Sequence, residues 1–212
     1  MLKRRHKMII VVSILILIAA VVCLTASIVL HRLNNEVDST GLPRKIRKSE
    51  WYDEASGRFR FPVDADCEEW SGLADYEKIE VQSIPEDILP WIPADNLVEL
   101  YWNLSYYTEY RFDDNMFAHQ EEARRIFAGR TDVAQYLIEL YRNEPIVNDE
   151  YSDRSIRRIE ALLERQVIQQ AMTAELKEEY RQVLEQKAQE KRDHSYYNRH
   201  TYLGDDLLIH YD

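Results

Sequence analysis

The chain has 212 residues, which is room for one ordinary domain or for one domain with a membrane anchor. Its composition, 45% apolar and 31% charged, is typical of a folded chain, and five glycines and six prolines do not suit collagen-like or glycine-rich linker architectures. The formal net charge of −11 disfavours nucleic acid as a partner, because nucleic-acid binding depends on basic surfaces that neutralise phosphates.

The N-terminal segment is basic at its start and then strongly apolar. Residues 9–30 form an apolar run whose polar members are Ser13, Thr25 and Ser27. A helix of this length rises roughly 33 Å, enough to cross a bilayer core of about 30 Å. Four basic residues precede the run and the chain after it is acidic, which predicts a cytoplasmic N-terminus and an extracytoplasmic C-terminal part. We therefore expect a single-pass protein of the cell membrane that contacts the lipid bilayer through residues 9–30.

Two alternatives to an uncleaved signal anchor stay open. Thr25 to Ser27 offers small residues for signal-peptide cleavage, although the apolar run is longer than the usual signal-peptide core. Cys23 is compatible with lipidation, although Val22 stands where a small residue is expected. The length of the run favours the uncleaved anchor.

The composition shifts along the chain predict four segments. They are a basic cytoplasmic tail (1–8), a transmembrane signal anchor (9–30), a juxtamembrane linker (31–50) and an extracytoplasmic, mainly helical domain (51–212).

Helical periodicity dominates the outer domain from Pro93 onward. Apolar residues spaced by three and four positions predict five helices. Their expected starts are Pro93, Asn115, Thr131, Ser155 and Thr173, with Thr131 and Thr173 as N-caps and the lysines, glutamates and glutamines of the last helix facing outward.

Short strands are expected beside these helices. Alternating apolar and polar residues predict edge strands over 58–63 and 79–82, and a turn at 203–206 predicts a small hairpin over 201–211. The expected fold class is therefore mainly α, with an N-terminal transmembrane helix, a compact bundle of about five helices, and a small β-hairpin or edge strands.

Two groups of residues have the chemistry of metal ligands. Asp64, Asp66 and Glu68 are spaced like the opening of a calcium loop, but the glycine and the bidentate glutamate of such a loop are missing. His194 and His200 lie in a C-terminal stretch rich in histidine and aspartate, a composition that suits zinc. The alternatives are a solvated acidic turn and ordinary surface histidines, and no cofactor is predicted.

Aromatic residues crowd the stretch 91–117. Trp91, Trp102, Tyr106 and Tyr110 are candidates for a binding surface, since aromatics with a polar handle are enriched where proteins contact partners or sugars. Core packing is the alternative role for the same residues.

The compact motifs of several large enzyme classes are missing from the sequence. It contains no G-x-S-x-G, P-loop, G-x-G-x-x-G or H-E-x-x-H. This favours a non-enzymatic interaction or binding module at the cell envelope, with an envelope protein or polymer as its partner. The alternatives are an envelope-associated hydrolase, metal-dependent through the acidic and histidine-rich stretches, and a structural membrane component without a specific ligand.

Residues 84–142 contain a combination of motifs that resembles exported bacterial proteins of unknown function. Ile84-Pro85 and Asn96-Leu97-Val98 resemble their I-P turn and S-T-x-x-L-V helix, while residues 130–132 and 137–141 resemble their R-x-D-A junction and L-L-x-x-Y helix. Ile92-Pro93 replaces the Ser-Thr pair and Val133 replaces the alanine. The resemblance implies an exported, mostly helical domain and assigns no catalytic residue.

Overall fold

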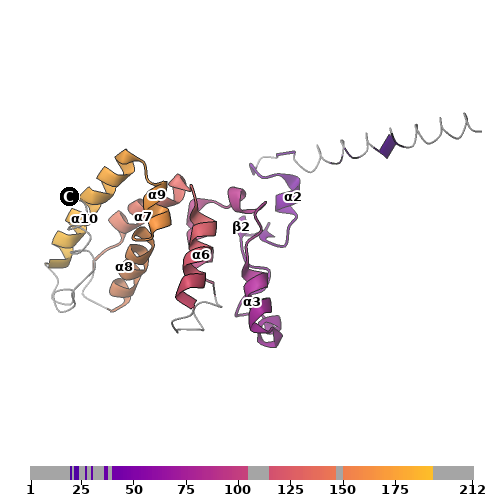
Figure 1. Ribbon diagram of the computed structural model, residues 1–212, viewed down its shortest axis with the longest axis horizontal. Helices are drawn as coiled ribbons and strands as arrows, with labels where there is room; N and C mark the ends of the chain where they lie inside the picture. The colour runs from indigo at the N-terminus through magenta and orange to yellow at the C-terminus, as the bar shows by residue number, and fades with distance from the viewer. Residues whose placement is uncertain are drawn as a thin grey trace, which may run out of the picture. The chain divides into compact units, whose positions relative to one another are not determined.

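The computed structural model describes residues 20, 22, 23, 27, 30, 36, 37, 40–104, 115–146 and 150–192, the side chains of 115–120 and 150–154 excepted. The chain divides into two compact units, Met1–Pro62 and Val63–Asp212. Within the described residues the structure is mainly helical, with one two-stranded antiparallel sheet (Figure 1). The predicted mainly α fold with a small β element is confirmed.

The first unit contains a short helix and a hairpin. Helix α2 (Arg44–Arg47) is followed by β1 (Tyr52–Asp53), which pairs antiparallel with β2 (Arg58–Phe59). Trp51 and Phe61 flank the hairpin and pack edge to face, with ring centroids 5.6 Å apart. The strand predicted at 58–63 is thus present at its first two residues, and α2 lies within the predicted linker.

The second unit begins with three short helices. They are the 3₁₀ helix η1 (Glu68–Gly72), helix α3 (Asp75–Gln82) and the 3₁₀ helix η2 (Leu89–Trp91). The strand predicted over 79–82 is wrong, because these residues belong to α3. The Glu77 carboxylate accepts the backbone N–H of Ala74 at 2.8 Å, which satisfies a free donor at the helix start. Acidic side chains in this first turn also suit the helix dipole.

Six further helices complete the described part of the unit. They are α4 (Ala94–Trp102), α6 (Asn115–Phe127), α7 (Thr131–Asn143), α8 (Glu150–Leu163), α9 (Gln166–Ala171) and α10 (Ala174–Arg192). Helix α7 contacts α4, α8, α9 and α10, so it forms the centre of the packing. Its buried residues are Val133, Ala134, Leu137, Ile138 and Tyr141.

The five predicted helices are present with changed boundaries. Helix α8 begins at Glu150 instead of Ser155, and Arg165 adopts an extended backbone that separates α8 from a further helix, α9. Thr173 accepts the N–H of Leu176 at 3.3 Å, which confirms its capping role. Thr131 instead lies inside α7 and donates its hydroxyl to the Ala171 carbonyl at 2.9 Å.

The predicted membrane anchor falls almost wholly outside the described residues. Over the part of the chain that is described, no helix combines the length and the apolar character needed to cross a bilayer. The hairpin predicted over 201–211 also lies outside the described ranges.

Candidate functional site

A pocket of about 340 Å³ lies where α6 approaches the junction of α8 and α9. Two arginines, Arg124 and Arg165, and two glutamines, Gln166 and Gln170, supply its polar lining. Ala161 and Val167 supply its apolar lining, and Glu164 also lines it.

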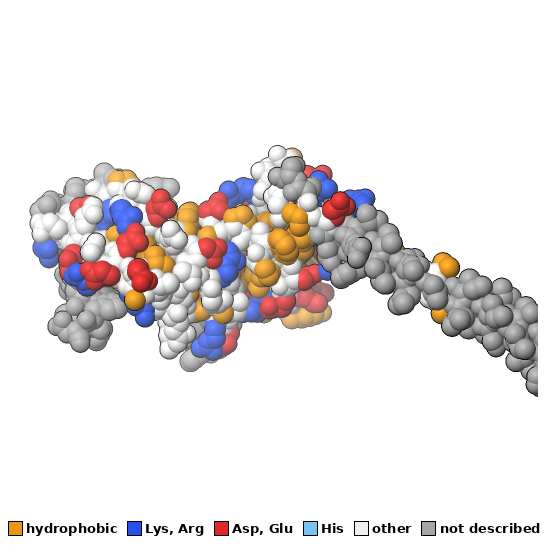
Figure 2. All heavy atoms as spheres, turned by 90° about the horizontal axis from the view of Figure 1, so that it is seen from above, with side chains coloured by type: hydrophobic (Ala, Val, Ile, Leu, Met, Phe, Trp, Pro, Cys, Tyr) orange, Lys and Arg blue, Asp and Glu red, His pale blue; other side chains and the backbone are white. Residues whose placement is uncertain are grey.

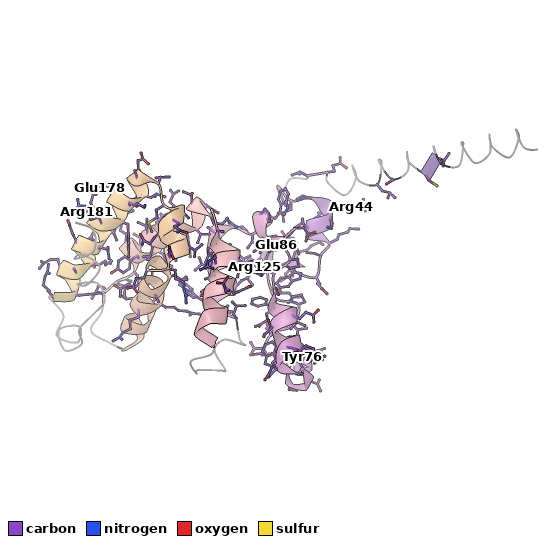
Figure 3. All side chains as sticks on the ribbon, in the orientation of Figure 1. Arg44, Tyr76, Glu86, Arg125, Glu178 and Arg181 are labelled. Atoms are coloured by element: carbon purple, nitrogen blue, oxygen red, sulfur yellow. The ribbon has the colours of Figure 1, made fainter. Side chains whose placement is uncertain are left out.

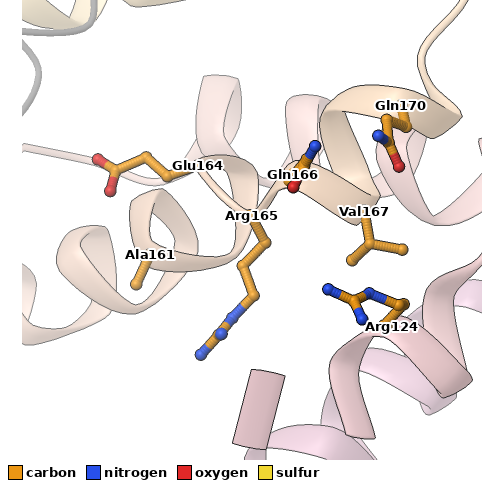
Figure 4. A pocket seen from close by; sticks show the side chains of 7 residues that line it. All are labelled: Arg124, Ala161, Glu164, Arg165, Gln166, Val167 and Gln170. Carbon is orange, nitrogen blue, oxygen red and sulfur yellow. The ribbon is translucent and has the colours of Figure 1, made fainter. Parts of the chain in front are cut away.

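The two guanidinium groups enter the pocket from different elements. Figure 4 shows Arg124 extending from α6 toward Val167, and Arg165 extending from the α8–α9 junction into the same space. The carboxylate of Glu164 points away from both. The pocket therefore presents positive charge, although acidic and basic side chains are interspersed on the face of the molecule seen in Figure 2.

Local contacts hold these two arginines in place. Arg165 lies where the backbone leaves α8 in an extended conformation, and its carbonyl accepts the N–H groups of Ile168 and Gln169 in the first turn of α9. Arg124 donates to Glu121 at 2.6 Å in an exposed pair one turn away on α6. Exposed pairs of this kind contribute little to stability, so Arg124 can exchange this partner at low cost.

The neighbouring Arg125 fastens α6 to the chain segment before η2. It donates to the Ile84 carbonyl at 2.7 Å and pairs with Glu86 at 3.2 Å (Figure 3). The hydrogen bond from Arg125 to Glu122 raises the pKa of Arg125, which keeps this guanidinium charged. Helix α6 is thereby anchored on one side while Arg124 faces the pocket.

Arginine side chains bind anions and do not exchange protons at ordinary pH. The guanidinium group stays protonated and offers a planar fork of donors that matches carboxylate and phosphate oxygens. A general acid or base must instead titrate near the working pH. The two arginines of this pocket are therefore suited to binding an anion.

A second polar cluster is buried among α7, α8 and α10. Glu160 accepts hydrogen bonds from the hydroxyl of Tyr141 and the ammonium of Lys191, and all three side chains are buried. Burial, together with the charge of Glu160, raises the pKa of Tyr141, so this phenol keeps its proton. Since the cluster is enclosed by packed helices, it joins three elements and is out of reach of a solvent-borne ligand.

Glu164 brings a second carboxylate close to this buried pair. Its Oε1 atom is buried and has no hydrogen-bond partner among the described residues. Burial raises the pKa of Glu164, the charge of Glu160 raises it further, and Lys191 opposes both effects.

The prediction that the lysines of the last helix face outward is wrong for Lys187 and Lys191. Both are buried, and Lys187 donates to the Glu144 carbonyl at 2.7 Å. Their spacing from Tyr180 and Leu184 already put them on the apolar stripe of α10, and this was the signal in the sequence.

Of the predicted metal ligands, the structure describes Asp64, Asp66 and Glu68. The carboxylate of Asp64 accepts the Asp66 N–H at 3.0 Å and the Cys67 thiol at 3.3 Å, so it is engaged within its own turn. No three His, Cys, Asp or Glu side chains in the described ranges are grouped so that they could hold a metal ion, and this includes Glu68. His194 and His200 lie outside those ranges.

The predicted aromatic surface is described only in part. Trp91 is 37% exposed, whereas Trp102 is half-buried beneath Arg158, whose Cζ lies 4.7 Å from the ring centroid. Arg158 also donates to the Trp102 carbonyl at 2.7 Å, which ties the end of α4 to α8. Tyr106 and Tyr110 lie outside the described residues.

The arginine pocket was not predicted, and no local motif marks it. Arg124 and Arg165 meet only because α6 contacts α9 in the folded unit. Comparison with protein-family models, curated proteins and solved structures finds no match to this chain, so the resemblance to exported bacterial proteins stays a prediction.

Proposed function

We propose that the chain is a single-pass membrane protein with an extracytoplasmic interaction module that binds a protein or polymer of the cell envelope. The apolar run 9–30, with basic residues before it and an acidic chain after it, supports the anchor and its orientation. In this proposal the N-terminus is cytoplasmic and residues 9–30 contact the lipid bilayer.

The observation that carries the binding role is the pocket lined by Arg124 and Arg165. Its volume of about 340 Å³ lies in the range usual for small-ligand sites. Its permanently charged donors suit recognition of an anionic group and not proton transfer. A module held on the outer side of the membrane with such a pocket is suited to capture envelope components.

Exposed aromatic area supports the same role. Trp91 presents over a third of its surface to solvent, and tryptophan is enriched at recognition surfaces because it offers a large apolar face with a polar edge. Trp102, Tyr106 and Tyr110 are proposed as further contacts of this kind.

The test combines localisation with capture. The full chain, carrying a C-terminal tag, is expected to stay in the membrane fraction after alkaline carbonate washing, and the tag is expected to be cleaved by protease added to intact cells after outer-layer removal. The purified chain, in an uncharged detergent, is expected to co-sediment with isolated envelope polymer. Loss into the soluble fraction would refute the anchor, and failure to bind any envelope fraction would refute the binding role.

A further inference from the structure

We infer that the pocket between α6 and the α8–α9 junction is a phosphate-recognition site for a polyol or sugar phosphate, with Arg124 and Arg165 as its anion ligands. The inference rests on the proposed function, since it names the ligand class of the same module.

The positions of the two guanidinium groups favour phosphate over a single carboxylate. Arg124 and Arg165 reach the pocket from separate elements (Figure 4), so an anion between them meets two donor forks from different directions. A planar carboxylate is satisfied by one fork, because its two oxygens form one bidentate edge. A tetrahedral phosphate can present separate pairs of oxygens to two forks at once.

The present surroundings of the arginines leave room for such an anion. Arg124 is paired with Glu121, but the side chains are 64% and 67% exposed, so water screens the pair and a ligand can displace it readily. Arg165 is half-buried, where a positive charge is screened less. The carboxylate nearest in sequence, that of Glu164, points away from the space between the guanidinium groups.

The remainder of the pocket fits an uncharged polar body attached to the phosphate. The volume of about 340 Å³ exceeds what a lone phosphate needs. The carboxamides of Gln166 and Gln170 offer both donors and acceptors, which match hydroxyl groups, and Val167 offers a small apolar surface for carbon–hydrogen faces. Glycerol phosphate and hexose phosphates have this combination of groups.

The test is calorimetric titration of the full chain in an uncharged maltoside detergent, at low ionic strength and in phosphate-free buffer. Glycerol 3-phosphate is expected to bind saturably, more tightly than inorganic phosphate, while glycerol gives no heat of binding. Succinate is expected to bind far more weakly. Added salt is expected to weaken the interaction, because part of the affinity is electrostatic.

Substitutions assign the binding to the pocket. Arg124→Gln and Arg165→Gln are each expected to weaken glycerol 3-phosphate binding by about tenfold or more, the usual effect of losing a hydrogen bond to a charged group. Arg181→Gln is the matched control, because Arg181 is a partly exposed arginine paired with Glu178 on α10. It is expected to leave binding unchanged. If Arg165→Gln lowers the melting temperature of the protein, weaker binding by that variant is not evidence for the site. The binding of the Arg124→Gln variant, whose substitution is at an exposed residue, then decides the result.

Several outcomes would overturn the inference. They are no saturable binding, equal loss in the Arg181 control, equal affinity for succinate, or equal affinity for inorganic phosphate and glycerol 3-phosphate. Co-sedimentation with envelope polymer, measured in parallel, separates the two claims. A chain that captures polymer but ignores glycerol 3-phosphate leaves the proposed function standing without this ligand class, whereas a chain that captures no envelope fraction refutes the proposed function itself.

Discussion

Lys191 on α10 donates a hydrogen bond to the carboxylate of Glu160 on α8, and the two residues are only 7% and 2% exposed. Tyr141 of α7 donates to the same oxygen, so three helices meet at one buried charge. A buried ion pair adds little net stability compared with apolar packing, but removing one partner leaves an uncompensated charge in the interior. The pair therefore acts mainly by specifying how these helices pack.

The substitution Lys191→Met is expected to lower the free energy of unfolding by about 3 kcal/mol, because Glu160 is left buried without its cation. Urea unfolding followed by circular dichroism measures this loss. The double variant Lys191→Met/Glu160→Gln is expected to recover most of it, since neither charge is then buried and the Gln carbonyl can still accept the hydrogen bond of Tyr141. A double variant no more stable than the single one would refute this account of the pair.

Glu164→Gln is expected to stabilise the protein at pH 7. Burial holds the pKa of Glu164 above its ordinary value of 4.5, so ionising this carboxyl at neutral pH opposes folding. Protonated Glu164 stabilises the folded parent protein. This stabilisation is fully present below pH 4.5 and is lost as the pH rises through the raised pKa of Glu164. The advantage of the variant should therefore shrink as the pH falls from 7 to 4.5, as measured by thermal melting.

Glu178→Gln serves as a control, because the stability of this variant relative to the parent protein is expected to have the opposite pH dependence. Hydrogen bonds from Arg181 and Gln182 lower the pKa of Glu178 to about 2. Its ionised form therefore favours folding above pH 4.5, and this contribution is lost as the pH falls toward 2. Parallel pH dependences for the Glu164 and Glu178 variants would contradict the assignment of burial as the cause at Glu164.

Arg130→Lys is expected to lower the free energy of unfolding by about 2 kcal/mol, because a lysine cannot reproduce the bridging donors of a guanidinium group. Arg130 donates to the carbonyls of Leu89 at 3.1 Å and Ile92 at 2.8 Å, and it also binds the Asp132 carboxylate. It thereby ties η2 to the start of α7. Denaturant unfolding of the lysine and methionine variants measures the effect, and a lysine variant as stable as the parent would show that charge alone suffices.

Gly129→Ala is expected to cost about 1 kcal/mol of stability, because an alanine is strained in the left-handed region. Gly129 follows α6 and has a φ of +70°, with no atom within 4 Å of the position that a Cβ would take. The cost therefore comes from the backbone and not from a clash. Gly72→Ala is the matched control, since it has similar space and no positive φ. Equal melting temperatures for the two variants would contradict this reading.

Local sequence patterns predicted the helices because their signals lie within a few neighbouring residues. The stop at Gly129, the cap at Thr173 and the buried residues Leu137 and Tyr141 all follow from spacing along one helix. The same reasoning failed at α3, because four alternating residues (79–82) do not distinguish a strand from a helix, and the Glu77 carboxylate that accepts an N–H at the helix start lies outside them.

The spacing of apolar residues also did not predict the break between α8 and α9. Leu163 and Val167 are spaced as if one helix continued, yet Arg165 adopts an extended backbone between them. Spacing alone cannot show such a break, because a short turn followed by a new helix keeps the same apolar positions. The break matters for the candidate site, since it places Arg165 at the pocket.

The sequence by itself determined that the chain is mainly helical and about where five of its helices begin, because both depend on periodicity and capping within one helix. The tertiary structure alone decided that Glu160 meets Lys191 in the interior and that Arg124 meets Arg165 at a pocket. These pairs lie far apart in the sequence, and their meeting depends on the packing of side chains between whole helices. That packing arises from the sum of many weak contacts, which no single motif records.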